Sequence, residues 1–409
     1  MPAFLSRPLP VAVLLALAAQ ALFSYGLGTP TKLVFDEVHY VPAARAVLAL
    51  SHPLNTEHPL LGKTLIAAGM ALFGDGPIGW RALSTVAGTA TVLGVYAILL
   101  SLFGSVRTAA VGGTLALLNF TIFVHARIAM LDAFMAAFVV LAVAAMLRGA
   151  HRRPALWWTL GSALLGLAVG VKWAAVPYVA YAGGAFLLLK WRRPALWPGM
   201  GLFPGLLILG LVSVGTYFLT FAPAFLYADR PLTLATLLPF QLEMYRLQTQ
   251  VLTPHGYQSS WWSWPLMLRP IWYLYEPVDG AQRGILLVGN PAVMWGGLVA
   301  VAACAWAAAR DRDGRLGGVA ALWIGSYGIW AIIPKSLGFF YYYYLPSIFL
   351  AVVLAAAAHR YLRARLEGWD EALLALAAGL FIYFYPILSA DALPNPGAFR
   401  RWTWFDGWV

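Results

Sequence analysis

Several carboxylates stand in or beside strongly apolar segments, where they could act as general bases. Asp36 and Glu37 lie in VFDEVHY, and Asp132 lies in VHARIAMLDAF together with His125 and Arg127. A carboxylate near a membrane is partly desolvated, which favours proton abstraction, and ionisable groups at membrane depth are usually paired or functional. Two simpler explanations stay open: a solvated loop acid for Asp36, and a structural pair between Arg127 and Asp132.

Cations occur in the same parts of the chain. EHPLLGK contains His58 and Lys63, GWRALST contains Arg81, and GVKWAA, which is expected to form a tight turn, contains Lys172. Clustered Lys and Arg neutralise a phosphate leaving group while a carboxylate activates an attacking hydroxyl; glycosyl transfer from a lipid-linked sugar requires both. We therefore predict that Lys63, Arg81 and Lys172 bind such a phosphate. For Lys172, the alternative is a side chain that extends from a helix end toward water.

A third set of polar and aromatic residues lies in the second half of the chain. His255, Trp261 and Arg269 lie in PHGYQSSWWSWPLMLRPIWY, and Lys335 precedes a run of tyrosines. Trp and Tyr clusters are typical of the membrane–water boundary. We expect these four residues, and the histidines of the first two sets, to contact substrate there.

The elements that must position these residues are membrane spans. The 409 residues are 61% apolar and 11% charged, whereas soluble domains are roughly 45–50% apolar and 25% charged. Disordered, disulfide-stabilised and nucleic-acid-binding classes are excluded, because the net charge of +11 is dispersed and Cys304 is the only cysteine. No metal-ligand set is predicted, and a need for a divalent metal stays open.

We predict an all-α polytopic membrane protein with about eleven transmembrane helices. The predicted spans are residues 9–27, 82–103, 108–124, 131–147, 156–171, 173–189, 199–221, 284–308, 317–333, 343–358 and 371–388. The first is interpreted as an anchor, because its apolar run exceeds the roughly 7–15 residues of a cleaved signal.

Residues 1–409 are expected to form a single transmembrane domain with two long loops, 28–81 and 222–283. The apolar stretch Leu60–Phe73 in the first loop is too short to span a bilayer and is expected to lie in its interface.

The distribution of Lys and Arg predicts the orientation. Dense clusters lie in the short connections on one side: Arg7, Arg107, 148–153, 190–193, 310–315 and 360–365. That side is expected to be cytoplasmic, which places the N-terminus inside and the C-terminus outside the plasma membrane. Eleven of the sixteen acids then fall outside, so carboxylate chemistry is expected on the extracytoplasmic face.

The ordered motifs VFDEVHY, EHPLLGK, GWRALS, ARIAMLD, GLAVGVKWAA, HGYQSSWWSWPLMLRPIWY and GNP resemble those of the protein O-mannosyltransferases, which belong to the glycosyltransferase C superfamily. The resemblance covers about residues 30–350. It implies an inverting transfer of mannose from polyprenyl-phosphate mannose to Ser or Thr hydroxyls of secreted or membrane proteins.

The resemblance also implies roles for individual residues. Asp36 would be the catalytic base, and Glu37 and Asp132 would organise acceptor and sugar. The lipid phosphate would be held by three cations: Lys172, Arg81 and Arg127.

Two features depart from the family pattern. His58-Pro59-Leu60 stands where the family usually has His-Pro-Pro, and the loop 222–283 is too short for the β-trefoil domain of eukaryotic members. The chain therefore resembles a minimal bacterial-type member, for which a lipid or glycan acceptor is the alternative to a protein. A secondary transporter is disfavoured, because the acids gather on one side and no two halves repeat.

Overall fold

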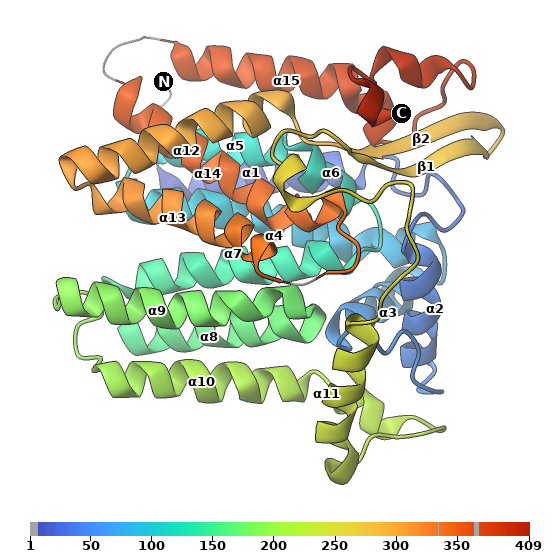
Figure 1. The fold of residues 1–409 in the computed structure, drawn as a ribbon, viewed down its shortest axis with the longest axis horizontal. Helices are drawn as coiled ribbons and strands as arrows, with labels where there is room; N and C mark the ends of the chain where they lie inside the picture. Colours follow the sequence, from blue (N-terminus) through green and yellow to red (C-terminus); the bar gives the residue numbers. More distant parts are fainter. Residues whose placement is uncertain (1–6, 334, 364–367) are drawn as a thin grey trace. The chain divides into compact units, whose positions relative to one another are not determined.

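The computed structural model describes residues 7–333, 335–363 and 368–409, which form two compact units (Figure 1). The Asp36 unit consists of Asp36–Gly94 and Ile128–Gln250. The terminal unit consists of the described residues up to Phe35, Val95–Arg127 and Val251–Val409. Arg365, which belongs to the last predicted cytoplasmic cluster, lies outside the described residues.

Long apolar helices and shorter helices make up the Asp36 unit. The long helices are α7 (Leu131–Gly149), α8 (Pro154–Val171), α9 (Val176–Arg192) and α10 (Leu202–Leu219). The others are α2 (Glu37–Leu48), α3 (Leu61–Phe73), the part of α4 (Pro77–Phe103) up to Gly94, and α11 (Leu234–Gln248). In Figure 1, α8, α9 and α10 run alongside one another, whereas α2 and α11 run crosswise to them.

Close packing between helices explains two of the glycines in this unit. A Cβ at Gly166 would clash with the backbone carbonyl of Ser213 in α10, so glycine allows the two helices to approach. In the same way, a Cβ at Gly62 would lie 2.5 Å from the Leu131 side chain of α7. These contacts bring α3 and α10 against the α7–α8 pair.

The turn predicted at GVKWAA is confirmed. Helix α8 ends at Val171, because Lys172 adopts an extended backbone with φ −156°, and α9 begins at Val176 after a short 3-10 turn. The single apolar run that Lys172 divides therefore forms two helices, α8 and α9.

Helix α14 (Tyr344–Tyr361) forms the centre of the terminal unit. Its most apolar stretch is 83% buried, the highest share of any candidate span in the described part of the chain. The helices around it are α1 (Pro8–Ser24), the rest of α4, α5 (Val106–Leu117), α6 (Phe120–Ala126), α12 (Pro291–Asp311), α13 (Gly314–Gly328) and α15 (Trp369–Leu388).

The predicted count of eleven spans is not confirmed. Within residues 7–333, 335–363 and 368–409, eight helices are long and apolar enough to cross a membrane, or nine if α5 and α6 are counted as one broken span. The predicted span 108–124 is this bent pair, in which the helices meet at 61°. Two predicted spans, 9–27 and 317–333, correspond to shorter helices, α1 with 17 residues and α13 with 15.

A two-stranded sheet interrupts the predicted all-α pattern. Strands β1 (Ile271–Val278) and β2 (Ala281–Leu287) pair antiparallel around Asp279 and Gly280, which have φ of 49° and 73°. Two positive φ values are typical of the type I′ hairpin turn. The predicted span 284–308 is corrected accordingly: its first residues belong to β2, and α12 begins only at Pro291, after the Asn290 cap.

The hairpin is bound to the segment that follows α1. The backbone N–H of Thr31 donates to Asp279 at 2.9 Å, and Lys32 pairs with Glu276 at 2.5 Å. The Phe35 ring stacks on a tyrosine of β1, with 4.0 Å between ring centroids. The strand pair therefore fixes residues 31–35 within the terminal unit.

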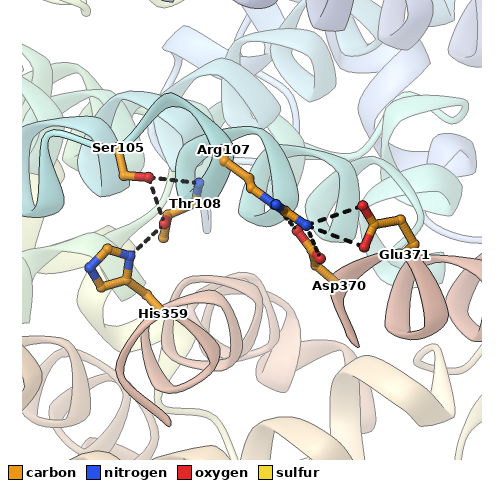
Figure 2. A network of polar contacts seen from close by, with 6 residues as sticks. All are labelled: Ser105, Arg107, Thr108, His359, Asp370 and Glu371. Atoms are coloured by element: carbon orange, nitrogen blue, oxygen red, sulfur yellow. Dashed lines mark hydrogen bonds and ion pairs between the residues drawn. The ribbon is translucent and has the colours of Figure 1, made fainter. Parts of the chain in front are cut away.

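A charged network joins the first turns of α5 and α15 (Figure 2). Arg107 donates to both carboxylate oxygens of Asp370 at 2.5 Å and to Glu371 at 3.1 Å. Thr108 and His359 share a hydrogen bond of 2.7 Å alongside. The neighbouring cavity of about 70 Å³ is lined by none of the predicted site residues, so we interpret this network as structural.

Candidate active site

Asp36 occupies the N-cap position of α2 in the Asp36 unit, and its side chain makes no capping hydrogen bond there. Its carboxylate is half-buried and accepts a 3.3 Å hydrogen bond from the hydroxyl of Tyr40, one helical turn further on. Burial raises the pKa of Asp36; the charge of Lys172 opposes this shift, that of Asp132 adds to it, and His39 and the Tyr40 hydrogen bond oppose it. A carboxylate that is reachable and has a raised pKa suits a general base.

Glu37 forms a buried ion pair with Arg81. The Arg81 Nε and Nη2 each donate at 2.8 Å to one oxygen of the Glu37 carboxylate, and neither side chain is exposed. The backbone N–H of Ala129 donates to the same carboxylate at 2.8 Å. Glu37 thus joins α2, α4 and the segment before α7.

The predicted roles of Arg81 and Glu37 stay predictions beside these contacts. Arg81 was expected to hold a phosphate, but its guanidinium fork is fully buried against Glu37. Glu37 was expected to organise acceptor and sugar, whereas its carboxylate binds protein groups. A buried bidentate pair of this kind is better suited to holding the backbone beside Asp36 than to contacting substrate.

Asp132 and Lys172 form a second buried pair. The Lys172 Nζ lies 3.0 and 2.9 Å from the two Asp132 carboxylate oxygens, and the side chains are only 9% and 4% exposed. Asp132 lies in the first turn of α7, while Lys172 follows the last turn of α8. Lys172 is therefore an internal ion-pair partner, and not a side chain that extends to water.

Lys63 lies in a cage of backbone carbonyls. Its amino group donates to the carbonyl oxygens of Asn55 at 2.6 Å and His58 at 2.8 Å, and burial lowers its pKa to about 7 although Glu57 opposes the shift. Through these contacts the amino group closes the loop before α3, and the phosphate role of Lys63 stays a prediction. The His58 ring lies edge-on to Tyr40, with 6.1 Å between centroids.

Two of the predicted residues lie in the interior of the terminal unit. The Arg127 guanidinium donates to the carbonyls of Phe23, Tyr25 and Gly26, so it satisfies the C-terminal end of α1. The ring of His125 is fully buried and bonds to the Thr121 carbonyl at 2.9 Å. These contacts give Arg127 a structural role at the end of α1, and its phosphate role stays a prediction.

The other predicted residues of the terminal unit lie nearer its surface. Arg269 donates to the carbonyls of Gly256, Gly407 and Val409, which ties the C-terminal residues to the loop before β1. The other three are exposed: His255, Trp261 and Lys335. Substrate contact by any of these four residues stays a prediction.

Sequence reasoning missed Tyr40 as a partner of Asp36. Its spacing of four residues in DEVHY gives the signal, because side chains at i and i+4 on a helix face each other. Among the described residues, no group of three or more His, Cys, Asp or Glu side chains is arranged to hold a metal ion.

Two protein-family models match the chain. Residues 57–218 match "Dolichyl-phosphate-mannose-protein mannosyltransferase", and residues 233–314 match "C-terminal four TMM region of protein-O-mannosyltransferase".

Curated relatives cover most of the chain. The polyprenol-phosphate-mannose–protein mannosyltransferase of Mycolicibacterium smegmatis is 30% identical over 84% of this chain and 80% of its own length. The protein of the same name from Mycobacterium tuberculosis is 28% identical over 93% of this chain and 87% of its own length.

Solved structures share the fold at low identity. The Saccharomyces cerevisiae protein O-mannosyltransferase Pmt1–Pmt2 complex bound to the sugar donor matches with a TM-score of 0.83, at 13% identity over 98% of this chain and 92% of the matched chain. ArnT from Cupriavidus metallidurans, bound to undecaprenyl phosphate, matches with a TM-score of 0.59, at 20% identity over 92% of this chain and 64% of its own.

The fold is therefore the one that this chain shares with these two solved structures. The chain belongs to the protein O-mannosyltransferase family, which confirms the resemblance of the ordered motifs.

Proposed function

We propose that this protein is an inverting mannosyltransferase that transfers mannose from polyprenyl-phosphate mannose to Ser or Thr hydroxyls of a protein, with Asp36 as general base. The names of the mycobacterial relatives support both donor and acceptor class. The observation that supports Asp36 is its setting: a half-buried carboxylate with a raised pKa at the start of α2, under the influence of the Lys172 and Asp132 charges.

In the proposed reaction the acceptor oxygen attacks the anomeric carbon of mannose from the face opposite the phosphate. The bond from that carbon to the phosphate oxygen breaks, and its electron pair leaves with the polyprenyl phosphate. The proton of the acceptor hydroxyl passes to Asp36. Because inversion needs no covalent sugar–enzyme intermediate, one base and stabilisation of the departing phosphate suffice.

We assign the stabilisation of the phosphate to Lys172, with Asp132 orienting its ammonium group. Charge-assisted hydrogen bonds to a phosphate oxygen strengthen as negative charge develops there. Glu37 and Arg81 are proposed to hold the first turn of α2, and Lys63 the loop before α3, so that Asp36 keeps its orientation.

The proposed reaction takes place on the extracytoplasmic side of the plasma membrane, where lipid-linked donor and secreted or membrane-bound acceptor would meet. The density of Lys and Arg in the short connections supports this orientation. The bilayer itself would supply the donor.

The proposal is tested with purified protein in lipid nanodiscs, labelled polyprenyl-phosphate mannose, and Ser- or Thr-containing peptides. We expect peptide mannosylation with inverted anomeric configuration and a loss of about 10²–10⁴-fold in kcat for Asp36→Asn. Asp229→Asn, at an acid whose side chain is 65% exposed, is the control and should be unaffected.

Near-normal turnover of a folded Asp36→Asn variant would remove Asp36 from the role of base. Transfer to a lipid or glycan in place of the peptides would keep the donor chemistry but replace the protein acceptor.

A further inference from the structure

Helix α11 exposes a continuous row of apolar side chains. Their exposed fractions are 84% for Leu234, 64% for Leu238, 64% for Leu242 and 58% for Tyr245. At about 100° per residue, these side chains fall within an arc of about 80°. We call this row the α11 face; apolar rows of this kind mark a surface that is covered by a partner or by lipid.

The remaining sides of α11 define its orientation. Met244 is buried and Phe240 packs edge-on against Phe221, so one side of the helix contacts its own unit. At about 100° per residue, Glu243 and Arg246 lie between the α11 face and the packed side; their side chains are 54% and 77% exposed and lie 3.7 Å apart. A packed side, an apolar exposed side and a charged exposed side are what a helix lying flat in a bilayer interface requires.

Helix α10 of the same unit also exposes apolar side chains. Helix α10 is one of the candidate spans, and it exposes Phe203, Leu207, Leu211 and Val214 by 74%, 45%, 66% and 54%. Acyl chains must cover these side chains in a membrane-spanning helix. Figure 1 shows α11 running crosswise at one end of α10, the position of a helix parallel to the membrane plane.

We propose that α11 lies in the lipid headgroup region, with the α11 face inserted among the upper acyl chains and with Glu243 and Arg246 toward water. The partner is the phospholipid leaflet. Helix α11 is also bound to the first long loop, because Gln248 donates to the backbone carbonyl of Glu57 at 2.6 Å. The leaflet surface thereby sets the depth of the loop that Lys63 closes.

The test places an environment-sensitive NBD fluorophore on single cysteines of the full chain in a Cys304→Ala background. The labelled variants are Leu238→Cys and Leu242→Cys on the α11 face, Glu243→Cys on the charged side, and Leu211→Cys in α10. Each is reconstituted in phosphatidylcholine nanodiscs with nitroxide lipids that carry the spin label near the headgroup or deep in the acyl chain.

We expect labels at 238 and 242 to be quenched roughly twofold or more by the shallow nitroxide, because an interfacial helix inserts about 5–10 Å. The label at 243 should show water-like emission and little quenching, and the label at 211 should be quenched more by the deep nitroxide.

Water-like emission at 238 and 242 would overturn the proposal. Shielding from water without nitroxide quenching would also overturn it, because a protein surface, such as a second copy of the chain, would then cover the α11 face. Since the readout needs no catalysis, its failure is separate from failure of the proposed mannosyltransferase activity.

Discussion

Arg81 binds Glu37 through two parallel hydrogen bonds: its Nε and Nη2 each donate at 2.8 Å to one carboxylate oxygen, and neither side chain is exposed. Glu37 is the residue next to Asp36, so this pair determines how the first turn of α2 presents the proposed base. A bidentate bond restricts both position and plane of the carboxylate.

Arg81→Met should destabilise the protein by about 3–5 kcal/mol, because it leaves the Glu37 carboxylate buried and unpaired. Thermal unfolding in detergent would measure the loss. The double variant with Glu37→Gln removes the orphaned charge and should regain part of the stability, while kcat stays low because the orientation of Asp36 is not restored. Equal unfolding temperatures for Arg81→Met and the parent would contradict the coupling.

Lys172→Met should raise the KM for the lipid-linked donor roughly 10–100-fold, because the variant loses a hydrogen bond between charged groups and the energy of such a bond corresponds to an affinity change of this size. It should also lower stability, because Asp132 is 4% exposed and loses its partner. The matched variant Lys172→Met with Asp132→Asn separates the two effects: stability should return, and donor affinity should not. If donor affinity returned as well, Lys172 would have only a structural role.

Tyr40→Phe should move the acid limb of the pH–rate profile to higher pH. The Tyr40 hydrogen bond stabilises the ionised carboxylate, so its loss raises the pKa of Asp36 further, and the base becomes protonated at a higher pH. The other groups that act on Asp36, Lys172, Asp132 and His39, are unchanged in this variant. kcat/KM measured across pH is the readout, with Tyr245→Phe on the exposed side of α11 as the control. An unshifted limb would show that the hydroxyl does not tune the base.

Lys63→Met should destabilise the protein by about 2–4 kcal/mol, because it leaves buried carbonyls of the loop before α3 without donors. Hydrogen exchange should accelerate selectively in residues 54–58. The pKa of Lys63 is lowered to about 7, below its value in an unfolded chain, so the folded state binds fewer protons above pH 7. The stability advantage of the parent over Lys63→Met should therefore grow as pH rises from about 7 toward 10. A difference that is constant over this range would contradict the lowered pKa.

The hydropathy pattern and the ordered motifs were sufficient to predict the fold class and the family. Apolar runs report burial in lipid directly, and the run divided by Lys172 even marked the turn between α8 and α9. The break between α5 and α6 was missed because both halves are apolar. At the break, Asn119 caps α6 through its side-chain oxygen and also donates to the backbone carbonyl of Ser347 in α14.

The pairing of charges was less accessible from the sequence. The sequence does not predict that Lys172 pairs with Asp132 and Arg81 with Glu37, because each ion pair depends on how the helices pack. Lys63 and Arg127 donate to backbone carbonyls. Because every residue has a backbone carbonyl, no pattern of side chains in the sequence predicts these contacts. The hairpin did have a signal, the Asp279-Gly280 dipeptide between two aromatic and aliphatic runs.

The position of the second ion pair has a consequence for the lengths of two spans. Asp132 lies in the first turn of α7 and Lys172 follows the last residue of α8, and these helices of 19 and 18 residues are joined by only residues 150–153. One residue added to either helix would rotate a side chain by about 100° and shift it by about 1.5 Å. A change in the length of either helix would therefore break the ion pair. The bilayer thickness that this helical hairpin spans and the geometry of the Asp132–Lys172 pair are thus constrained by the same two helix lengths.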